Sequence, residues 1–304
     1  MRPDFFVVGA AKAGTTAVHH ALSRHDAVYL PRQKETNYFA LFGEPPRFTG
    51  PLDEQTINRF SVWRQEDYER LFRLAPSGTL TGEVCPMYLY SDTAPANIAE
   101  TAPNARIVVF LREPLSRAIS AYRQLVRDGR ETESFARAVD LEPERIQAGW
   151  EWFWHLASVG MYADQVARYL NAFGRDRVRI FLYDELVERP NEVLDDMQRF
   201  LGLPVRDRLS LGTHNRAGVP RPGSRSVHRW LYRPSRLNTV LRAVLPEPLR
   251  RAASTGFKRL ILSKPTDELE VPRDLNERFL DDVVRLERII ERDLSRWRDR
   301  LEQV

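Results

Sequence analysis

A glycine-rich loop, Gly9 to Thr16, joins an apolar run to an amphipathic segment near the start of the 304-residue chain. Gly9 and Gly14 keep the spacing of a Walker A phosphate-binding loop, but the lysine lies inside the loop at Lys12, and Thr15 takes its usual place. A strand that enters a helix through such a turn directs backbone N–H groups and the positive end of the helix dipole at one point. The loop therefore favours a phosphate-sized anion, although an ordinary tight turn would have the same pattern.

A second candidate anion site follows another apolar run, in "RIVVFLREPLSRAISAYRQL" (106–125). Arg112 comes directly after the run, Pro114 begins a helix, and Ser120 lies eight residues after the arginine. Ligands of open parallel sheets bind beyond the carboxyl ends of the strands, so we expect Arg112 to face the same crevice as the loop. Alone, Arg112 fits a surface ion pair better. Together with the loop, a guanidinium beside a hydroxyl indicates a nucleotide with phosphates at two separate places.

Lysine is rare in this chain. Of 46 Lys plus Arg residues only four are lysine, and two of these are Lys12 and Lys34. Because this sequence uses arginine for most positive charges, the few lysines indicate positions that need a compact ammonium group.

The motifs "KAGTT" (12–16) and "REPLSRAIS" (112–120) together resemble those of sulfotransferases that use 3′-phosphoadenosine 5′-phosphosulfate (PAPS). The resemblance implies that the loop holds the 5′-phosphosulfate, that Arg112 and Ser120 hold the 3′-phosphate, and that adenosine 3′,5′-bisphosphate (PAP) is released without any need for a metal. Lys12 would reach the bridging oxygen, where negative charge grows as the bond to sulfur breaks. The loop residues implied in donor binding are Lys12, Ala13, Gly14, Thr15, Thr16 and Ala17.

Two further segments are similar to the family's catalytic segments. "PRQKETNYF" (31–39) resembles one in which a lysine, here Lys34, orients the sulfuryl group. "TGEVCPMYLY" (81–90) resembles one whose glutamate is the general base, which makes Glu83 the group that removes the acceptor's proton. A partly desolvated carboxylate at a strand end can have its pKa raised toward the working range. Cys85 departs from the small hydroxyl residue usual at its position.

The resemblance also covers the second half of the chain. Tyr183, in "FLYDELVERP", corresponds to a tyrosine near the adenine, and "THNRAGVPR" (213–221) to a loop that closes over the nucleotide. Arg221 is the candidate phosphate ligand there, with Arg216 as its alternative. If Glu83 is not the base, His155 and His214 are the remaining candidates.

The elements that position these residues are expected to form one α/β domain over 1–304. We predict a P-loop-like, doubly wound parallel sheet flanked by helices, because short buried strands alternate with helical patterns. The strands are predicted at 4–9, 27–30, 79–85, 106–111 and 177–183. The helices are predicted at 15–25, 54–74, 114–128, 144–157, 161–173 and 190–201. A loop rich in Gly and Pro (204–226) is expected to cover the nucleotide, and 227–304 to be helical, with a basic stretch at 227–262 and a last helix at 273–298.

Composition restricts the classes of function. The net charge is +4, spread along the chain, which suits a small anionic ligand and gives no reason to expect nucleic acid as a partner. Cys85 is the only cysteine, and no run is apolar enough to span a membrane, so we expect a cytoplasmic protein. No His, Asp and Glu cluster has metal-ligand spacing. The sequence leaves open whether the chain forms homo-oligomers.

The acceptor is expected to be a small molecule or glycan with a free hydroxyl, bound in a cleft lined by 34–42, 85–90 and 149–156. The aromatic stretch in the last of these (Trp150, Trp152, Trp154) is more typical of packing than of a pocket. Two other functions use the same residues. A Mg²⁺-dependent phosphoryl transferase would need an acidic residue at a strand end, which only Asp184 or Glu185 could supply, and a non-enzymatic anion-binding module would need no crevice.

Overall fold

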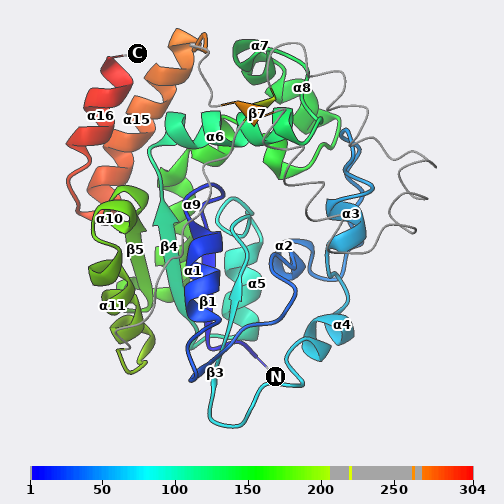
Figure 1. Ribbon diagram of the computed structural model, residues 1–304, viewed down its shortest axis with the longest axis vertical. Coiled ribbons are helices and arrows are strands. Elements are labelled where there is room, and N and C mark those ends of the chain that lie inside the picture. The colour runs from blue at the N-terminus through cyan, green and yellow to red at the C-terminus, as the bar shows by residue number, and fades with distance from the viewer. Residues whose placement is uncertain (1, 206–218, 221–261, 264–268, 304) are drawn as a thin grey trace.

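The computed structural model describes residues 2–205, 219–220, 262–263 and 269–303 (Figure 1). Five parallel strands form its central sheet in the order β2-β3-β1-β4-β5. They are β1 (Phe5–Gly9), β2 (Val28–Tyr29), β3 (Leu80–Val84), β4 (Arg106–Leu111) and β5 (Val178–Leu182). All five predicted strands are confirmed, and so is the doubly wound α/β fold.

Strand β1 lies at the centre of the sheet, and the side chains of Phe5 to Val8 are fully buried because helices cover both faces. The connection from β1 to β2 runs toward one edge of the sheet, and the connection from β3 to β4 runs toward the other edge. Because such crossovers are right-handed, their helices, α1 (Thr15–Leu22) and α5 (Ala94–Thr101), lie on opposite faces of the sheet. In such a fold, ligands bind where the direction of the connections reverses, which is here at the carboxyl ends of β1 and β4.

Helices α5, α9 (Tyr162–Phe173) and α15 (Arg273–Ile290) pack on one another along one face. Helix α6 (Pro114–Arg127) runs across the carboxyl edge of the sheet (Figure 1). The other helices among the described residues are α2 (Tyr38–Leu41), α3 (Ile57–Phe60), α4 (Gln65–Arg70), α7 (Phe135–Asp140), α8 (Glu142–Gln147), α10 (Tyr183–Glu188), α11 (Pro190–Leu201) and α16 (Ser295–Glu302), with short 3₁₀ turns at Trp152–Trp154, Ser158–Gly160 and Arg175–Arg177.

Three of the predicted helices are interrupted in the structure. The predicted helix 54–74 is two short helices, because Ser61 is extended and the Val62 N–H donates to the Thr36 carbonyl at 2.8 Å. The predicted helix 144–157 ends at Gln147, before Gly149 with its φ of +74°. The predicted helix 273–298 is α15 and α16, separated at Glu291, whose φ is +54°.

Most of the predicted nucleotide-covering loop, 204–226, and of the basic stretch, 227–262, lies outside the described residues. Within them, β6 (Val219–Pro220) pairs antiparallel with β7 (Leu262–Ser263). The predicted loop therefore contains a two-residue strand. Arg216, Arg221 and His214 lie outside the described part of the chain.

Candidate active site

The loop after β1 is held in a fixed turn. Gly14 has φ +89°, and a Cβ atom there would lie 2.8 Å from the Leu186 side chain and 3.2 Å from that of Tyr183, so α10 packs directly on this glycine. The Ala13 N–H donates to the Ala10 carbonyl at 3.1 Å. Lys12 also has a positive φ, +72°, which is uncommon for a residue with a side chain. Such backbone conformations persist where surrounding packing enforces them, as α10 does here.

The Lys12 ammonium lies beside other positive charges. Its Nζ donates to Gln124 Oε1 on α6 at 2.6 Å. Burial, and then the charges of Arg127 and Arg112, lower the pKa of Lys12 to about 8. Because these positive charges repel one another, an anion bound among them would be stabilised. Gln124 and Arg127 were not predicted from the sequence.

Arg112 joins the loop to the helix that follows β5. Its Nη1 donates to the Lys12 carbonyl at 3.2 Å, and its guanidinium carbon lies 4.7 Å from the centre of the Tyr183 ring. The structure therefore brings together Lys12, Arg112 and Tyr183, which come from three different strand ends. They meet at the place where the order of the strands predicts a ligand site.

The other residues predicted to bind the sulfuryl donor differ in the polar groups that they could direct toward it. Ser120 lies on α6 one helical turn before Gln124, on the side of the helix that meets Lys12. Thr15 is buried and Thr16 exposed. The Ala17 N–H already donates to the Gly14 carbonyl at 2.9 Å. Ala13 and Ala17 are buried, and their side chains bring no polar group.

Lys34 lies at the same loop. Its Nζ donates to Thr16 Oγ1 at 3.3 Å and forms an ion pair with the neighbouring Glu35. Glu35 has φ +61°, and its N–H donates to the carbonyl of Val84 at the end of β3, which fixes the segment beside the sheet. The sequence drew attention to Lys34 but not to the exposed carboxylate next to it.

Glu83 is buried within a network of hydroxyl groups. Thr36 and Tyr88 donate to its Oε1 at 2.5 and 2.9 Å, and Tyr68 donates to its Oε2 at 2.7 Å. The residue is 1% exposed, and burial raises the pKa of its carboxyl group. Both oxygens are therefore already engaged, and an acceptor hydroxyl could reach Glu83 only after this network had opened.

The three segments predicted to line the acceptor cleft meet at one cavity of about 450 Å³, here called the Gln165 cavity. Ala40, Tyr90 and Trp152 each come from one of these segments. The lining is completed by Ser91, Asp92, Thr93, His155, Ser158, Met161, Asp164, Gln165 and Arg168.

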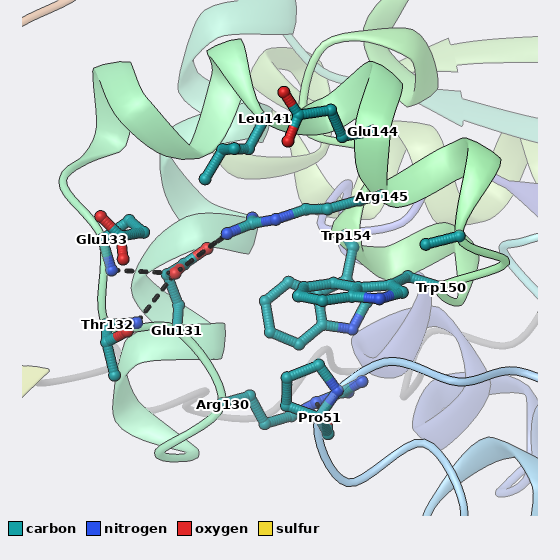
Figure 2. A pocket seen from close by; sticks show the side chains of 11 residues that line it. Pro51, Arg130, Glu131, Thr132, Glu133, Leu141, Glu144, Arg145, Trp150 and Trp154 are labelled. Carbon is teal, nitrogen blue, oxygen red and sulfur yellow. Dashed lines mark hydrogen bonds and ion pairs between the residues drawn. The ribbon is translucent and has the colours of Figure 1, made fainter.

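A second cavity, of about 340 Å³, lies beside α7 and α8 and is here called the Arg145 cavity (Figure 2). Arg145 lies between Glu131, to which it donates at 2.6 Å, and the rings of Trp150 and Trp154, whose centres are 4.9 and 5.0 Å from its guanidinium carbon. Trp150 and Trp154 thus have the packing role that the sequence favoured. Neither cavity includes Lys12 or Arg112 in its lining.

Within the described ranges no group of His, Cys, Asp and Glu side chains is arranged to hold a metal ion. No helix among these residues is long and apolar enough to cross a membrane.

Comparison with known proteins agrees with this geometry. A profile of the sulfotransferase family matches residues 3–207. The crystal structure of a sulfotransferase from Alicyclobacillus acidocaldarius is 33% identical, with a TM-score of 0.72, over 98% of this chain and 99% of that chain. The sulfotransferase domain of the curacin biosynthetic pathway, 16% identical with a TM-score of 0.52, covers 97% of this chain and 99% of its own, and shares the fold.

Among curated relatives, mouse heparan sulfate glucosamine 3-O-sulfotransferase 3B1 is 27% identical over 202 residues, which are 66% of this chain and 46% of that protein. Mouse bifunctional heparan sulfate N-deacetylase/N-sulfotransferase 3 is 29% identical over 211 residues, 66% of this chain and 22% of that protein. The chain thus spans less than half the length of these relatives. The match of the family profile over most of the chain, and the bacterial structure over nearly all of it, show that the chain belongs to the sulfotransferase family.

Proposed function

We propose that this protein transfers the sulfuryl group of PAPS to a hydroxyl group of an acceptor. The main support for the proposal is that Arg112 donates to the Lys12 carbonyl, which brings the two cationic residues together at the ends of β1 and β4. A nucleotide with phosphates at its 5′ and 3′ positions would bridge these two cations. In-line attack of the acceptor oxygen on sulfur would break the bond to the 5′-phosphate oxygen, transfer the sulfuryl group and release PAP.

In this proposal Lys12 stabilises the departing oxygen. Its ammonium is largely desolvated, so it interacts more strongly with a developing negative charge than it would in water. Arg112 and Ser120 hold the 3′-phosphate, and the N–H groups of Gly14, Thr15 and Thr16 hold the 5′ side together with the two threonine hydroxyls. Tyr183 supports the nucleotide through its contact with Arg112. Lys34, from across the loop, neutralises the sulfuryl oxygens.

The general base is better assigned to Glu35 than to Glu83. The Glu35 side chain is 46% exposed and pairs with Lys34 at the loop, whereas Glu83 is enclosed by three hydroxyl groups. A general base must come within hydrogen-bond distance of the proton that it removes. Glu83 then acts as a positioning residue, because its hydrogen bond to Thr36 holds the segment that carries Glu35.

A phosphoryl transferase is less well supported. The acidic residues that could hold Mg²⁺ near the crevice already have cationic or N–H partners. Asp184 accepts from the Trp297 indole at 3.2 Å, and Glu185 pairs with Arg189 and Arg292. Metal binding at these carboxylates would require breaking the contacts between α10 and the last helices.

The proposal is tested first by ligand-dependent melting. PAP without metal should raise the melting temperature of the wild type, and ATP with Mg²⁺ should not. Lys12→Ala should fold normally and lower the rate of transfer from PAPS by about 10²- to 10³-fold, the usual effect of removing one group that stabilises a developing oxyanion. Full activity of Lys12→Ala would remove this residue from the mechanism. Stabilisation by ATP with Mg²⁺ alone would favour a kinase.

A pair of variants tests the choice of base. Glu35→Gln should lower kcat by at least about 10²-fold with little change in the melting temperature. Glu83→Gln should mainly lower the melting temperature, because its amide group would oppose a hydroxyl donor in the buried network. The reverse result would return the role of base to Glu83.

A further inference from the structure

Three residues that line the Gln165 cavity each have a buried polar atom without a hydrogen-bond partner in the described part of the chain. The atoms are Gln165 Oε1, His155 Nε2 and Arg168 Nε. Gln165 is 4% exposed and His155 5% exposed, so water in the bulk does not satisfy them freely. Buried polar groups are nearly always paired in folded proteins, and three unpaired ones around a single cavity indicate a missing polar ligand.

The orientation of Gln165 is fixed by its own contacts. Its Nε2 donates to the carbonyls of Met161 at 2.7 Å and Ser158 at 3.0 Å, which leaves Oε1 as an acceptor without a donor. A ligand at this place would have to supply an N–H or O–H group.

His155 offers a second, complementary group. Its Nδ1 lies 3.0 Å from the Tyr90 hydroxyl, and burial lowers the pKa of the ring, so it is neutral near pH 7. The Trp150 backbone also interacts with the ring, but Nε2 has no hydrogen bond of normal geometry. A hydroxyl group both donates and accepts, and it could therefore satisfy Gln165 Oε1 and His155 Nε2.

The charges around the cavity are already compensated. Arg168 pairs with Asp92 at 3.2 Å, and Asp164 pairs with Arg285. A sulfate or carboxylate would find no free cation comparable to the cluster around Lys12. The cavity thus favours a neutral ligand with several hydroxyl groups.

The remaining lining fits such a ligand and connects it to the donor loop. Trp152 and Tyr90 bring aromatic rings that can cover the C–H face of a sugar. They also pack against the small cluster of Ala11, Met87 and Val159. Because Ala11 belongs to the loop that carries Lys12, a group held in this cavity lies one layer of side chains from the proposed donor site.

We propose, on the basis of the proposed function, that the Gln165 cavity binds one neutral sugar unit of the acceptor and so determines which acceptors are used. The sugar held there is bound but not sulfated, and Gln165, His155 and Trp152 recognise it. Its binding places a hydroxyl group of a neighbouring unit at the loop that carries Lys12. The acceptor class is therefore a glycoside whose bound unit is uncharged.

The test compares two substitutions that add the same side chain to the two cavities. Ala40→Leu fills the Gln165 cavity without removing a hydrogen bond, and Ala148→Leu makes the matched change in the Arg145 cavity. Binding of neutral methyl glycopyranosides (gluco, galacto, manno and xylo forms) is measured by saturation-transfer NMR at millimolar concentration, with and without PAP. At least one glycoside should bind the wild type and Ala148→Leu equally, and Ala40→Leu about tenfold or more weakly. His155→Phe should also weaken binding about tenfold, the usual effect of one lost hydrogen bond.

The outcomes separate this inference from the proposed function. If no glycoside binds the wild type, or if Ala40→Leu binds as well as Ala148→Leu, the sugar site is wrong, whatever PAP does. If glycosides bind as expected but PAP fails to stabilise the protein, the sugar site stands and sulfuryl transfer from PAPS is wrong. In the active enzyme, Ala40→Leu should raise KM for a glycoside acceptor and leave KM for PAPS unchanged, which a general loss of folding would not do.

Discussion

The Arg145 cavity and the Gln165 cavity are built from the same kinds of residue but differ in pairing. Each has arginine, acidic and tryptophan side chains in its lining. In the first, Glu131 accepts from Arg145 and from the N–H groups of Thr132 and Glu133 (Figure 2). In the second, Gln165 and His155 retain unpaired atoms. This difference in pairing supports the proposal that the Gln165 cavity binds a ligand, whereas the Arg145 cavity is part of the structural framework.

The largest effect should come from breaking the pairing of the Arg145 cavity. Arg145→Met leaves the Glu131 carboxylate buried without its cation, and removing one partner of a buried ion pair costs about 3–5 kcal/mol of unfolding free energy. Urea denaturation of the variant measures the loss. A change below about 1 kcal/mol would show that the Glu131 carboxylate is solvated or protonated there, and the contrast between the cavities would lose its basis.

The comparison extends to the loop that carries Lys12, where positive charges lie close together. Since the pKa of Lys12 is lowered to about 8, its positive charge is present below that pH and lost above it. The affinity for PAP should therefore fall above about pH 8, by up to tenfold for each pH unit. Titration calorimetry from pH 7 to pH 10 checks this, and Lys12→Met should remove most of the dependence. An affinity constant up to pH 10 would contradict the lowered pKa.

A smaller effect concerns the stability of the Gln165 cavity in acid. Burial lowers the pKa of His155 in the folded state, so below about pH 6.5 the unfolded chain binds a proton that the folded chain does not. Its contribution to stability is complete above that pH and is lost as the pH falls. Melting curves from pH 5 to pH 7 should be less pH-dependent for His155→Phe than for the wild type. His19→Gln is a useful comparison, because burial lowers the pKa of His19 to about 4 and gives the same sign.

The smallest effect is expected from the charged rim of the Gln165 cavity. Asp164 pairs with Arg285 at an exposed position, where water screens the two charges and the pair contributes little to stability. Asp164→Asn should change neither the melting temperature nor glycoside binding by a measurable amount. A clear loss of glycoside binding would move recognition from the unpaired neutral atoms to the charged rim.

Much of the fold and the donor site could be predicted from the sequence. Apolar runs identify β1 and β4 most clearly because these strands are buried on both faces, whereas β2, at the edge of the sheet, is half-buried. Lys12, Arg112 and Tyr183 come together because the carboxyl ends of parallel strands share one edge. These features could be predicted because they depend only on local composition and on the order of the strands.

Other parts depend on contacts that no local pattern encodes. Gln124 is one glutamine in an amphipathic helix, and its contact with Lys12 depends on how α6 packs against the loop. The breaks near Ser61 and Glu291 come from contacts with distant segments or from a single residue with positive φ. Glu83 carries a motif, but its burial depends on the Tyr68 ring, which comes from another helix.

The network around Glu83 has a consequence for the optical properties of the protein. Burial raises the pKa of Tyr68 and Tyr88 well above the usual value, and the same holds for Tyr169, whose hydroxyl donates to the Tyr88 carbonyl. In an alkaline spectrophotometric titration these three phenols should not form phenolate while the sheet is intact. Their phenolate absorbance should instead appear as one step at high pH, when the buried network around Glu83 opens.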